Sequence, residues 1–369
     1  MNSSTKILSA SVLAILLLFG CDQRKTPTSA PQLETSSTET EFSELEKSSS
    51  ASPRHVVIAN RAGGSISVID LNTDQVVGTH ALPTASKTPE PMYVVWARNA
   101  GRVFVGDRAN NRVVVFRDHD FSLETTVPAG AGIWHMWADE REQQLWVAND
   151  IDKTCTVINP TTLQVLATVP LPTDLVALGG KPHDVMVSRY GKQAYVSLIG
   201  VQGASDYVVL YSTNSFEEKG RAAVGKDPHL STPFQRELLY VPCQNSNAVI
   251  ALDRFTMQQV ASINVPGAHG ANMMRSEKVF YTTNLPGGGI NGVFAIDPAT
   301  HRVLGSVNTP FPTPHNLAVT PNGRKLYVTH SGATANQVTV YSVSGKNPVP
   351  VYLKSITAGL NPFGLALTR

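Results

Sequence analysis

Four histidines occur in similar short contexts, each just before a stretch of alternating apolar residues. The contexts are "KPHD", "DPHL", "GAHG" and "TPHN", which hold His183, His229, His269 and His315. Neutral imidazoles are good ligands for copper, iron and zinc, and they also carry protons near neutral pH. If the fold brings these corners together, they predict either a metal site or a rim that binds an organic ligand.

A structural explanation of the same pattern stays open. Proline fixes the entry of a chain into a strand, and an imidazole beside it can form hydrogen bonds with neighbouring backbone. Duplication of a repeat would multiply such a corner without creating a ligand site. The four histidines show no compact HxxxH spacing, so a metal here would need ligands from corners far apart in the sequence.

The composition narrows the class of protein. Hydrophobic residues make up 42% of the 369 residues, charged residues 16%, and the formal net charge is +2. Low charge density with many Gly and Pro residues favours a sizeable core with many turns. A nearly neutral chain has no electrostatic footprint for nucleic acid, so nucleic-acid binding is not expected.

The N-terminus predicts export and lipidation. Lys6 precedes an apolar run over residues 8–19 that is short for a bilayer span, which indicates a signal peptide over residues 1–20. Its end, "LLFGC", resembles the lipobox of bacterial lipoproteins, and that resemblance implies cleavage before Cys21 and lipidation of its thiol. An ordinary signal peptide with an incidental cysteine is the alternative.

Residues 21–53 are rich in Ser, Thr, Glu and Pro and contain few apolar residues. Such a segment buries too little surface to offset its ordering entropy, so we expect a disordered, lipidated tether. The expected location is the bacterial cell envelope, lipid-anchored and facing the periplasm or the cell surface. The choice of inner or outer membrane stays open.

The remaining chain repeats a strand that ends in a turn-forming residue. The copies are "HVVIAN", "RVFVGD", "QLWVAND", "QAYVS", "LLYVPC", "VFYTTN" and "KLYVTH". They recur roughly every 40 to 47 residues, the period of a four-stranded propeller blade. β-branched and aromatic residues alternate between Gly, Pro, Asn and Asp corners, whereas no stretch shows a convincing helical period.

The end of the chain supplies a strand that the beginning lacks. The segment "NPFGLALTR" matches the innermost strand of the other units, and the first unit has none of its own. We therefore predict that residues 54–369 form one all-β, seven-bladed β-propeller with four-stranded blades. The C-terminal strand completes blade 1 and removes the last sheet edge.

Two resemblances to known families accompany this pattern. The units "PNGRKLYVTH" and "AIDPATHRVLGSV" resemble the YVTN repeat of seven-bladed propeller proteins, over nearly all of residues 54–369. That family includes binding and surface-layer proteins, so the resemblance implies a fold more than a function. The stretch "DRANNRVVVF", residues 107–116, is similar to part of the propeller of nitrous oxide reductases, which implies copper held by rim histidines.

In a propeller, innermost strands begin at the face where the "YVTN" strands end. The four corner histidines are therefore expected on one rim of the channel, with His135 one position further along its strand. The strand-end residues predicted on the same face are His330, Asp107, Asp150 and Cys243. Trp134 and Met92 occupy corners equivalent to His183 and are expected to line the channel. Cys155 and Cys243 lie too far apart for a disulfide.

Three function classes follow. The first, which we favour, is a monomeric, membrane-tethered binding module that presents its histidine-rich rim to a small ligand or an envelope protein. The second is a copper- or iron-dependent redox enzyme that uses His183, His229, His269 and His315, although no cofactor is certain from the sequence. The third is a metal-free lyase that resembles the streptogramin lyases, whose characteristic repeat units are not reproduced. Whether the chain is an enzyme stays open.

Overall fold

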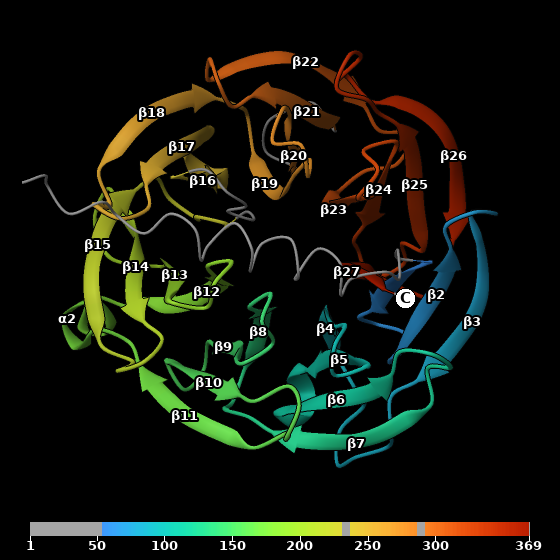
Figure 1. Cartoon of the computed structure of the whole chain (residues 1–369), viewed down its shortest axis with the longest axis horizontal. Helices are drawn as coiled ribbons and strands as arrows, with labels where there is room; N and C mark the ends of the chain where they lie inside the picture. The colour runs from blue at the N-terminus through green and yellow to red at the C-terminus, as the bar shows by residue number, and fades with distance from the viewer. Residues whose placement is uncertain (1–53, 231–236, 286–291, 369) are drawn as a thin grey trace, which may run out of the picture. The chain divides into compact units, whose positions relative to one another are not determined.

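A computed structural model describes residues 54–230, 237–285 and 292–368. These residues form seven antiparallel sheets arranged in a circle, with the innermost strand of each sheet nearest the centre of the circle (Figure 1). Residues 51–369 make one compact unit. The predicted signal peptide, the tether and Cys21 lie outside the described residues.

Six sheets have four strands, and the innermost strand is given first for each. Blade 1 contains β27 (Pro362–Thr368), β1 (His55–Asn60), β2 (Ser65–Asp70) and β3 (Gln75–Ala81). Blade 2 contains β4 (Pro91–Ala97), β5 (Arg102–Asp107), β6 (Arg112–Arg117) and β7 (Leu123–Pro128). Blade 3 contains β8 (Ile133–Ala138), β9 (Leu145–Asn149), β10 (Thr154–Ile158) and β11 (Val165–Pro170).

The later blades repeat this order. Blade 4 contains β12 (Lys181–Val187), β13 (Gln193–Ile199), β14 (Asp206–Ser212) and β15 (Glu218–Val224). Blade 5 contains β16 (Leu238–Cys243), β17 (Ala248–Asp253) and β18 (Gln259–Asn264). Blade 6 contains β19 (Ala268–Met273), β20 (Phe280–Asn284), β21 (Gly292–Asp297) and β22 (Arg302–Asn308). Blade 7 contains β23 (Pro314–Val319), β24 (Lys325–His330), β25 (Gln337–Ser342) and β26 (Val351–Thr357).

The C-terminal strand closes the circle as predicted. Strand β27 pairs antiparallel with β1, from His55 opposite Thr368 to Asn60 opposite Pro362. The two ends of the propeller chain therefore share one sheet, and neither leaves an unpaired inner edge in blade 1. The sequence prediction of a seven-bladed all-β propeller is confirmed.

Neighbouring blades are joined by the tyrosine of the repeated strand. The hydroxyls of Tyr195, Tyr240 and Tyr281 donate hydrogen bonds to backbone carbonyls of the following blade, at 3.1, 3.0 and 2.9 Å. In blade 7 the hydroxyl of Tyr327 donates to Asp74 of blade 1. Each ring is buried between two blades and its polar tip is satisfied, as buried tyrosines require.

Blade 5 departs from the pattern at its innermost position. Its named strands number three, and Pro228 forms an isolated bridge with Cys243 where the other blades begin a full inner strand. The segment 231–236 is not among the described residues. The sequence already marked this blade as different, because "STPFQRELLY" lacks the usual glycine turn.

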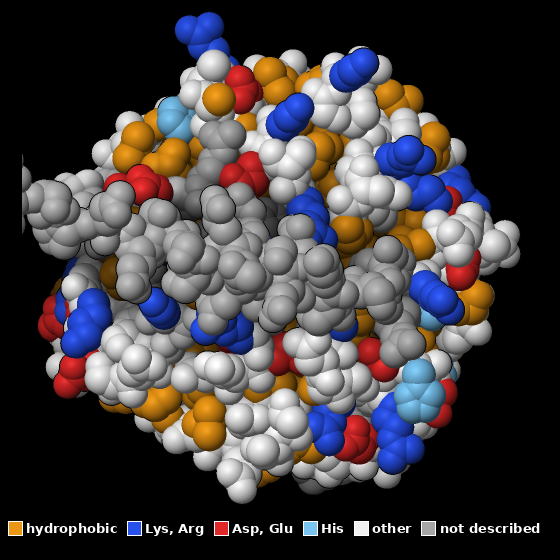
Figure 2. Space-filling model, viewed as in Figure 1, with side chains coloured by type: hydrophobic (Ala, Val, Ile, Leu, Met, Phe, Trp, Pro, Cys, Tyr) orange, Lys and Arg blue, Asp and Glu red, His pale blue; other side chains and the backbone are white. Residues whose placement is uncertain are grey.

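The described helices are short. One single-turn helix, α2 (Thr173–Ala177), precedes β12, and the 3-10 turns η1 (Arg108–Asn110) and η2 (Gln244–Ser246) follow β5 and β16. Within the described ranges no helix is long and apolar enough to cross a bilayer. The face shown in Figure 2 carries Lys and Arg side chains interspersed with Asp and Glu around its circumference.

Candidate functional site

Each described inner strand has a bulge near its start, and these bulges position the side chains of the site. In β12 the pairing with β13 breaks between Pro182 and Val185, and the other described inner strands break at the equivalent place. A bulge leaves residues outside the ladder and re-aims their side chains. In blade 5 the Pro228 bridge puts His229 at the same position. The first residues of these bulges, which we call the corner residues, are Met92, Trp134, His183, His229, His269, His315 and Phe363.

Contacts between blades fix these corners. The hydroxyl of Thr283 in blade 6 donates to the carbonyl oxygen of His315 in blade 7, at 3.0 Å. The hydroxyl of Thr329 likewise donates to the carbonyl oxygen of Phe363, at 2.7 Å. Blade 6 has Gly270 after its corner because a Cβ there would lie 2.2 Å from the His315 carbonyl oxygen. The corners of blades 7 and 1 are therefore held by the preceding blade as well as their own.

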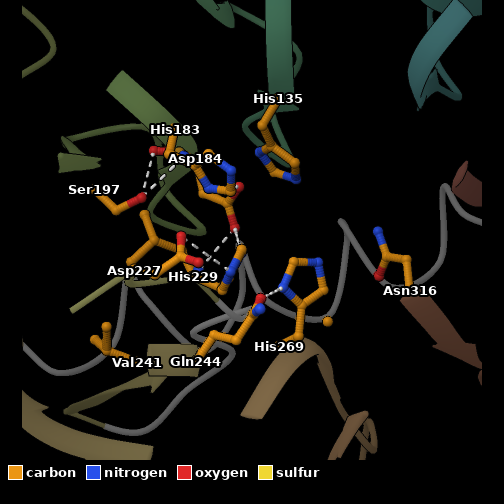
Figure 3. A network of polar contacts seen from close by, with 12 residues as sticks. His135, His183, Asp184, Ser197, Asp227, His229, Val241, Gln244, His269 and Asn316 are labelled. Atoms are coloured by element: carbon orange, nitrogen blue, oxygen red, sulfur yellow. Dashed lines mark hydrogen bonds and ion pairs between the residues drawn. The ribbon is translucent and has the colours of Figure 1, made fainter. Parts of the chain in front are cut away.

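The structure brings the four corner histidines into one contiguous cluster, of which Figure 3 shows His183, His229 and His269. Ring centroids are 4.7 Å apart for His183 and His229, 3.8 Å for His229 and His269, and 4.7 Å for His269 and His315. All four side chains are buried. We call this set the channel histidines.

Aromatic corners complete the circle. The His315 ring lies 3.8 Å from the Phe363 ring, and the Trp134 ring lies 5.2 Å from His183. Trp134 and Phe363 are 6.0 Å apart, so the channel histidines end on an aromatic pair at both sides. Met92 is fully buried beside Phe363. Trp134 is thus part of the channel wall as the sequence suggested.

A buried carboxylate lies inside the cluster. Asp184 follows His183 in the bulge and is 4% exposed. Its Oδ1 lies 3.2 Å from Nδ1 of His183, and its Oδ2 lies 3.5 Å from Nδ1 of His229. The backbone N–H of Leu230 also donates to Oδ2, at 3.0 Å. Asp227 approaches from the other side, with Oδ1 3.8 Å from Nε2 of His229.

Sequence reasoning missed both acids, although "KPHD" and "DPHL" contain them. An acidic residue beside a turn is common, and strand alternation would send Asp184 away from the face of His183. The side chains of consecutive residues 183 and 184 can contact each other because both residues lie in the bulge, where strand alternation is interrupted.

The acid and one histidine favour opposite charges. Burial alone would raise the pKa of Asp184, but His135, His183 and His229 hold this pKa well below the usual range. Burial would lower the pKa of His229, yet its contacts with Asp184 raise it overall. Asp184 is therefore ionised inside the cluster, and it makes protonation of His229 easier.

Three further histidines, His135, His269 and His315, favour the neutral form. Burial and the nearby His229 hold the pKa of His269 well below the usual range, and they lower the pKa of His315 to about 3. His269 donates from Nδ1 to Oε1 of Gln244 at 2.8 Å, so its Nε2 carries a lone pair. Burial also lowers the pKa of His135, whose Nδ1 donates to the Val185 carbonyl oxygen at 3.0 Å.

Several buried polar atoms of this region lack a hydrogen-bond partner among the described residues. Those on the cluster and its aromatic neighbour are Trp134 Nε1, His229 Nε2 and His315 Nδ1, together with His183 Nδ1 and Asp184 Oδ1, which contact each other only as an ion pair at 3.2 Å. Buried polar groups in folded proteins are nearly always satisfied, and a concentration of exceptions calls for an explanation. A bound ligand, ion or water would supply one.

His330 and Asp107 are not brought to this cluster. His330 donates from Nδ1 to the Pro312 carbonyl oxygen at 3.0 Å and accepts at Nε2 from the Thr339 hydroxyl at 2.9 Å. Asp107 accepts hydrogen bonds from the Glu90 N–H and the Asn110 amide and forms an ion pair with Arg112. Both residues end a repeated strand and hold their own blade together.

Asn60 and Asn149 occupy the same strand-end position as His330 and Asp107, and their side chains also form hydrogen bonds within their own blade. Their amides donate to the hydroxyls of Ser67 and Thr156, each at 2.9 Å, in the next strand of the blade. We call Asn60, Asp107, Asn149 and His330 the strand-end residues. Their position in the repeat, rather than a ligand, explains their polarity.

The other candidates have local partners. Asp150 forms an ion pair with Arg108 at 3.0 Å. Burial raises the pKa of the Cys243 thiol to about 12, so the thiol stays protonated and is a poor ligand. Cys155 and Cys243 are both free and buried, which confirms that they do not pair.

Sequence comparison assigns the fold to a family. Residues 24–260 match the family described as "Lactonase, 7-bladed beta-propeller". The chain belongs to this lactonase family. No curated protein sequence matches it significantly.

Solved structures resemble this lactonase-family propeller in fold alone, because the identities are low. A putative 6-phosphogluconolactonase of Bacteroides fragilis is 16% identical with a TM-score of 0.67, covering 87% of this chain and 99% of its own. Kuenenia stuttgartiensis hydrazine synthase is 15% identical with a TM-score of 0.65, covering 77% and 92%. Dihydro-heme d1 dehydrogenase NirN, in complex with DHE, is 12% identical with a TM-score of 0.58, covering 85% and 75%.

Proposed function

We propose that this chain is a ligand-binding propeller that holds a small molecule or ion at the mouth of its channel. The observation that carries the proposal is the group of buried polar atoms without a hydrogen-bond partner on Trp134, His229 and His315, which lie around the ion pair of His183 and Asp184. Binding sites are concave, largely preformed, and combine aromatic walls with a few convergent polar groups. The channel histidines and their aromatic neighbours have this composition.

The aromatic side of the cluster suits the organic part of such a ligand. The Arg61 guanidinium carbon lies 5.0 Å from the Phe363 ring centroid, and that of Arg108 lies 4.9 Å from the Trp134 ring centroid. Glu90 and Asp150 neutralise these two arginines. A flat or ring-shaped ligand can thus pack on aromatic surface while its polar atoms meet the channel histidines.

Lactone hydrolysis is the second candidate, and one observation favours it besides the family's name. His269 is neutral, and its hydrogen bond to Gln244 leaves Nε2 free to accept a proton. As a general base it would take a proton from water while the water oxygen bonds to the lactone carbonyl carbon. The ring C–O bond then breaks, and the same proton passes to the alkoxide to give the hydroxy acid.

The envelope location completes the proposal. Cys21 in "LLFGC" is the proposed lipidation site, with residues 21–53 as the tether to a bacterial membrane. The proposed state is a monomer facing the periplasm or cell surface, with an envelope protein as an alternative partner. A Cys21→Ser variant should lose incorporation of labelled fatty acid, whereas incorporation at the parent level would exclude this anchor.

The ligand-binding proposal is tested by thermal unfolding with a panel of small molecules, including an aldonolactone and its acid. A ligand should raise the melting temperature of the parent and of His330→Asn, a strand-end control. The same ligand should not change the melting temperature of His315→Gln or Trp134→Ala. An equal rise in melting temperature in all four proteins would place the binding site elsewhere. If the parent hydrolyses the lactone and His269→Gln does not, the enzymatic candidate is favoured.

A further inference from the structure

Two channel histidines share one buried carboxylate. The Nδ1 atoms of His183 and His229 face the two oxygens of Asp184, at 3.2 and 3.5 Å. A carboxylate on one ring nitrogen orients an imidazole and increases the basicity of the other, which is the usual arrangement behind a metal-bound histidine. Both Nε2 atoms are therefore the ones available to a ligand.

A third donor lies on the Nε2 side. Asp227 Oδ1 is 3.8 Å from Nε2 of His229, and one donor atom from each of His183, Asp227 and His229 lies within 4.8 Å of the others. Donors bound to a single ion at about 2.0 to 2.2 Å stand roughly 3 to 4 Å apart. Small side-chain rotations would bring these three donors onto one ion (Figure 3).

Asp227 is not required by the repeat. Its φ of 59° lies in the left-handed region, and the equivalent residues are Gly267 with φ 59°, Thr313 with φ 57° and Asn361 with φ 57°. Glycine fits this backbone most easily, and asparagine tolerates it. Among the described corners with this left-handed turn only blade 5 has a carboxylate, so the turn itself does not require the acid. Blade 2 has Glu90 at the same place in the repeat without this turn, and Glu90 pairs with Arg61.

The charge of the site also calls for a cation. Asp184 is buried and Asp227 is partly buried, and within the described ranges neither forms an ion pair with a lysine or arginine. A buried carboxylate is costly unless a cation compensates it, and among the described residues histidines are the only ion-pair partners of these two acids. One divalent ion would balance the two carboxylates.

We propose that His183 and His229, through Nε2, and Asp227, through its carboxylate, bind one divalent transition-metal ion, with Asp184 orienting both imidazoles. The proposal rests on the proposed function, because the ion would be the ligand, or part of the ligand site, at the channel mouth. Two imidazoles and a carboxylate suit Fe²⁺, Co²⁺, Ni²⁺ or Zn²⁺ rather than Ca²⁺ or Mg²⁺, which prefer oxygen donors alone.

This set is narrower than the four-histidine set expected from the sequence. The donors that lie within 4.8 Å of one another come from His183, Asp227 and His229, and neither His269 nor His315 belongs to this group. These two imidazoles lie beside the ion without being ligands. Three protein ligands leave coordination positions open for water or substrate, as in catalytic metal sites.

The test is a titration of the full chain with Co²⁺, followed by its visible absorption, and competition by Zn²⁺. The parent should bind one Co²⁺ per chain and lose the absorption when Zn²⁺ is added. Asp184→Asn should weaken binding about 10- to 100-fold, the usual effect of removing an orienting carboxylate. His183→Gln, His229→Gln and Asp227→Asn should each weaken it more, whereas His315→Gln should change it less than about threefold.

Matched variants separate the possible results. Asp227→Gly keeps the left-handed turn and removes the donor, so its melting temperature without metal should match the parent while Co²⁺ binding is lost. Equal loss in His315→Gln and Asp227→Asn would overturn this ligand set, and a parent that binds no Co²⁺ would overturn the metal site. If an organic ligand still stabilises that metal-free parent, the proposed function survives; if none does, both proposals fail.

Discussion

Blade 7 contains two buried histidines, His315 and His330, that differ in the hydrogen bonds of their ring nitrogens. Burial lowers the pKa of His315 to about 3 and that of His330 to about 4, so both are neutral. His330 has a partner at each ring nitrogen, whereas Nδ1 of His315 has none among the described residues. Burial therefore does not distinguish a structural histidine from a candidate ligand-binding one, but the satisfaction of its nitrogens does.

The backbone explains this difference. Strand-end residues lie in a regular ladder, next to the hydroxyls of the following strand, and Asn60 and His330 both bind such a hydroxyl. Corner residues lie in a bulge, outside the ladder and at the channel. One repeat thus contains a polar position whose side chain binds the next strand of its own blade and another whose side chain leaves the ladder and contacts the corners of neighbouring blades.

Deleting residues 361–369 should have the largest effect, because it removes Phe363 from the corners and the pairing partner of β1. All cooperative unfolding near the parent melting temperature should be lost, since the circle would open along a buried edge. Thermal unfolding followed by circular dichroism measures this. A truncated chain that melts like the parent would contradict the closure.

Gly270→Ala should be the next most damaging change, at about 3 kcal/mol or more, because the new Cβ would lie 2.2 Å from the His315 carbonyl oxygen. Gly220→Ala in β15 is the matched control, since its Cβ would meet Met257 Cγ at an ordinary 3.6 Å. Urea unfolding of both variants gives the comparison. Equal stabilities would show that the corners tolerate movement between blades.

His330→Ala should cost about 2 to 4 kcal/mol at neutral pH, because it removes two buried hydrogen bonds and leaves a cavity. His315→Ala should cost less, since Nδ1 has no protein partner to lose. Chemical unfolding gives the free energy of unfolding of both variants, and so compares a corner residue with a strand-end residue. A larger loss for His315→Ala would reverse our assignment of the two positions.

The pH dependence of stability should be the smallest effect. An unfolded histidine has a pKa of about 6.5, and His330 in the fold has one of about 4. Between these values the unfolded state binds a proton that the folded state does not, so stability falls as pH decreases. His330→Asn should remove about 1.6 kcal/mol of the loss between pH 6.5 and pH 5.

Asparagine is the conservative choice there because Asn60 and Asn149 occupy the same repeat position. Unfolding free energies at both pH values, for parent and variant, provide the measurement. An unchanged slope in His330→Asn would mean that His330 is already protonated in the fold.

The sequence predicted the propeller because its repeat is explicit: the "YVTN"-like strands and the orphan C-terminal segment specify seven blades and their closure. It also predicted that His183, His229, His269 and His315 share one face. It could not separate His315 from His330, because both lie at that face and only hydrogen-bond geometry distinguishes them. Asp184 and Asp227 were missed because a bulge and a left-handed turn aim them, and neither is visible in strand alternation.

The most direct test is anomalous X-ray diffraction from crystals of the chain grown with Co²⁺. We expect a single strong peak about 2.0 to 2.2 Å from one nitrogen each of His183 and His229 and from a carboxylate oxygen of Asp227. His330 should have no peak beside it. Crystals without a peak at the channel mouth, or with one at the strand-end residues, would contradict the distinction between the two positions.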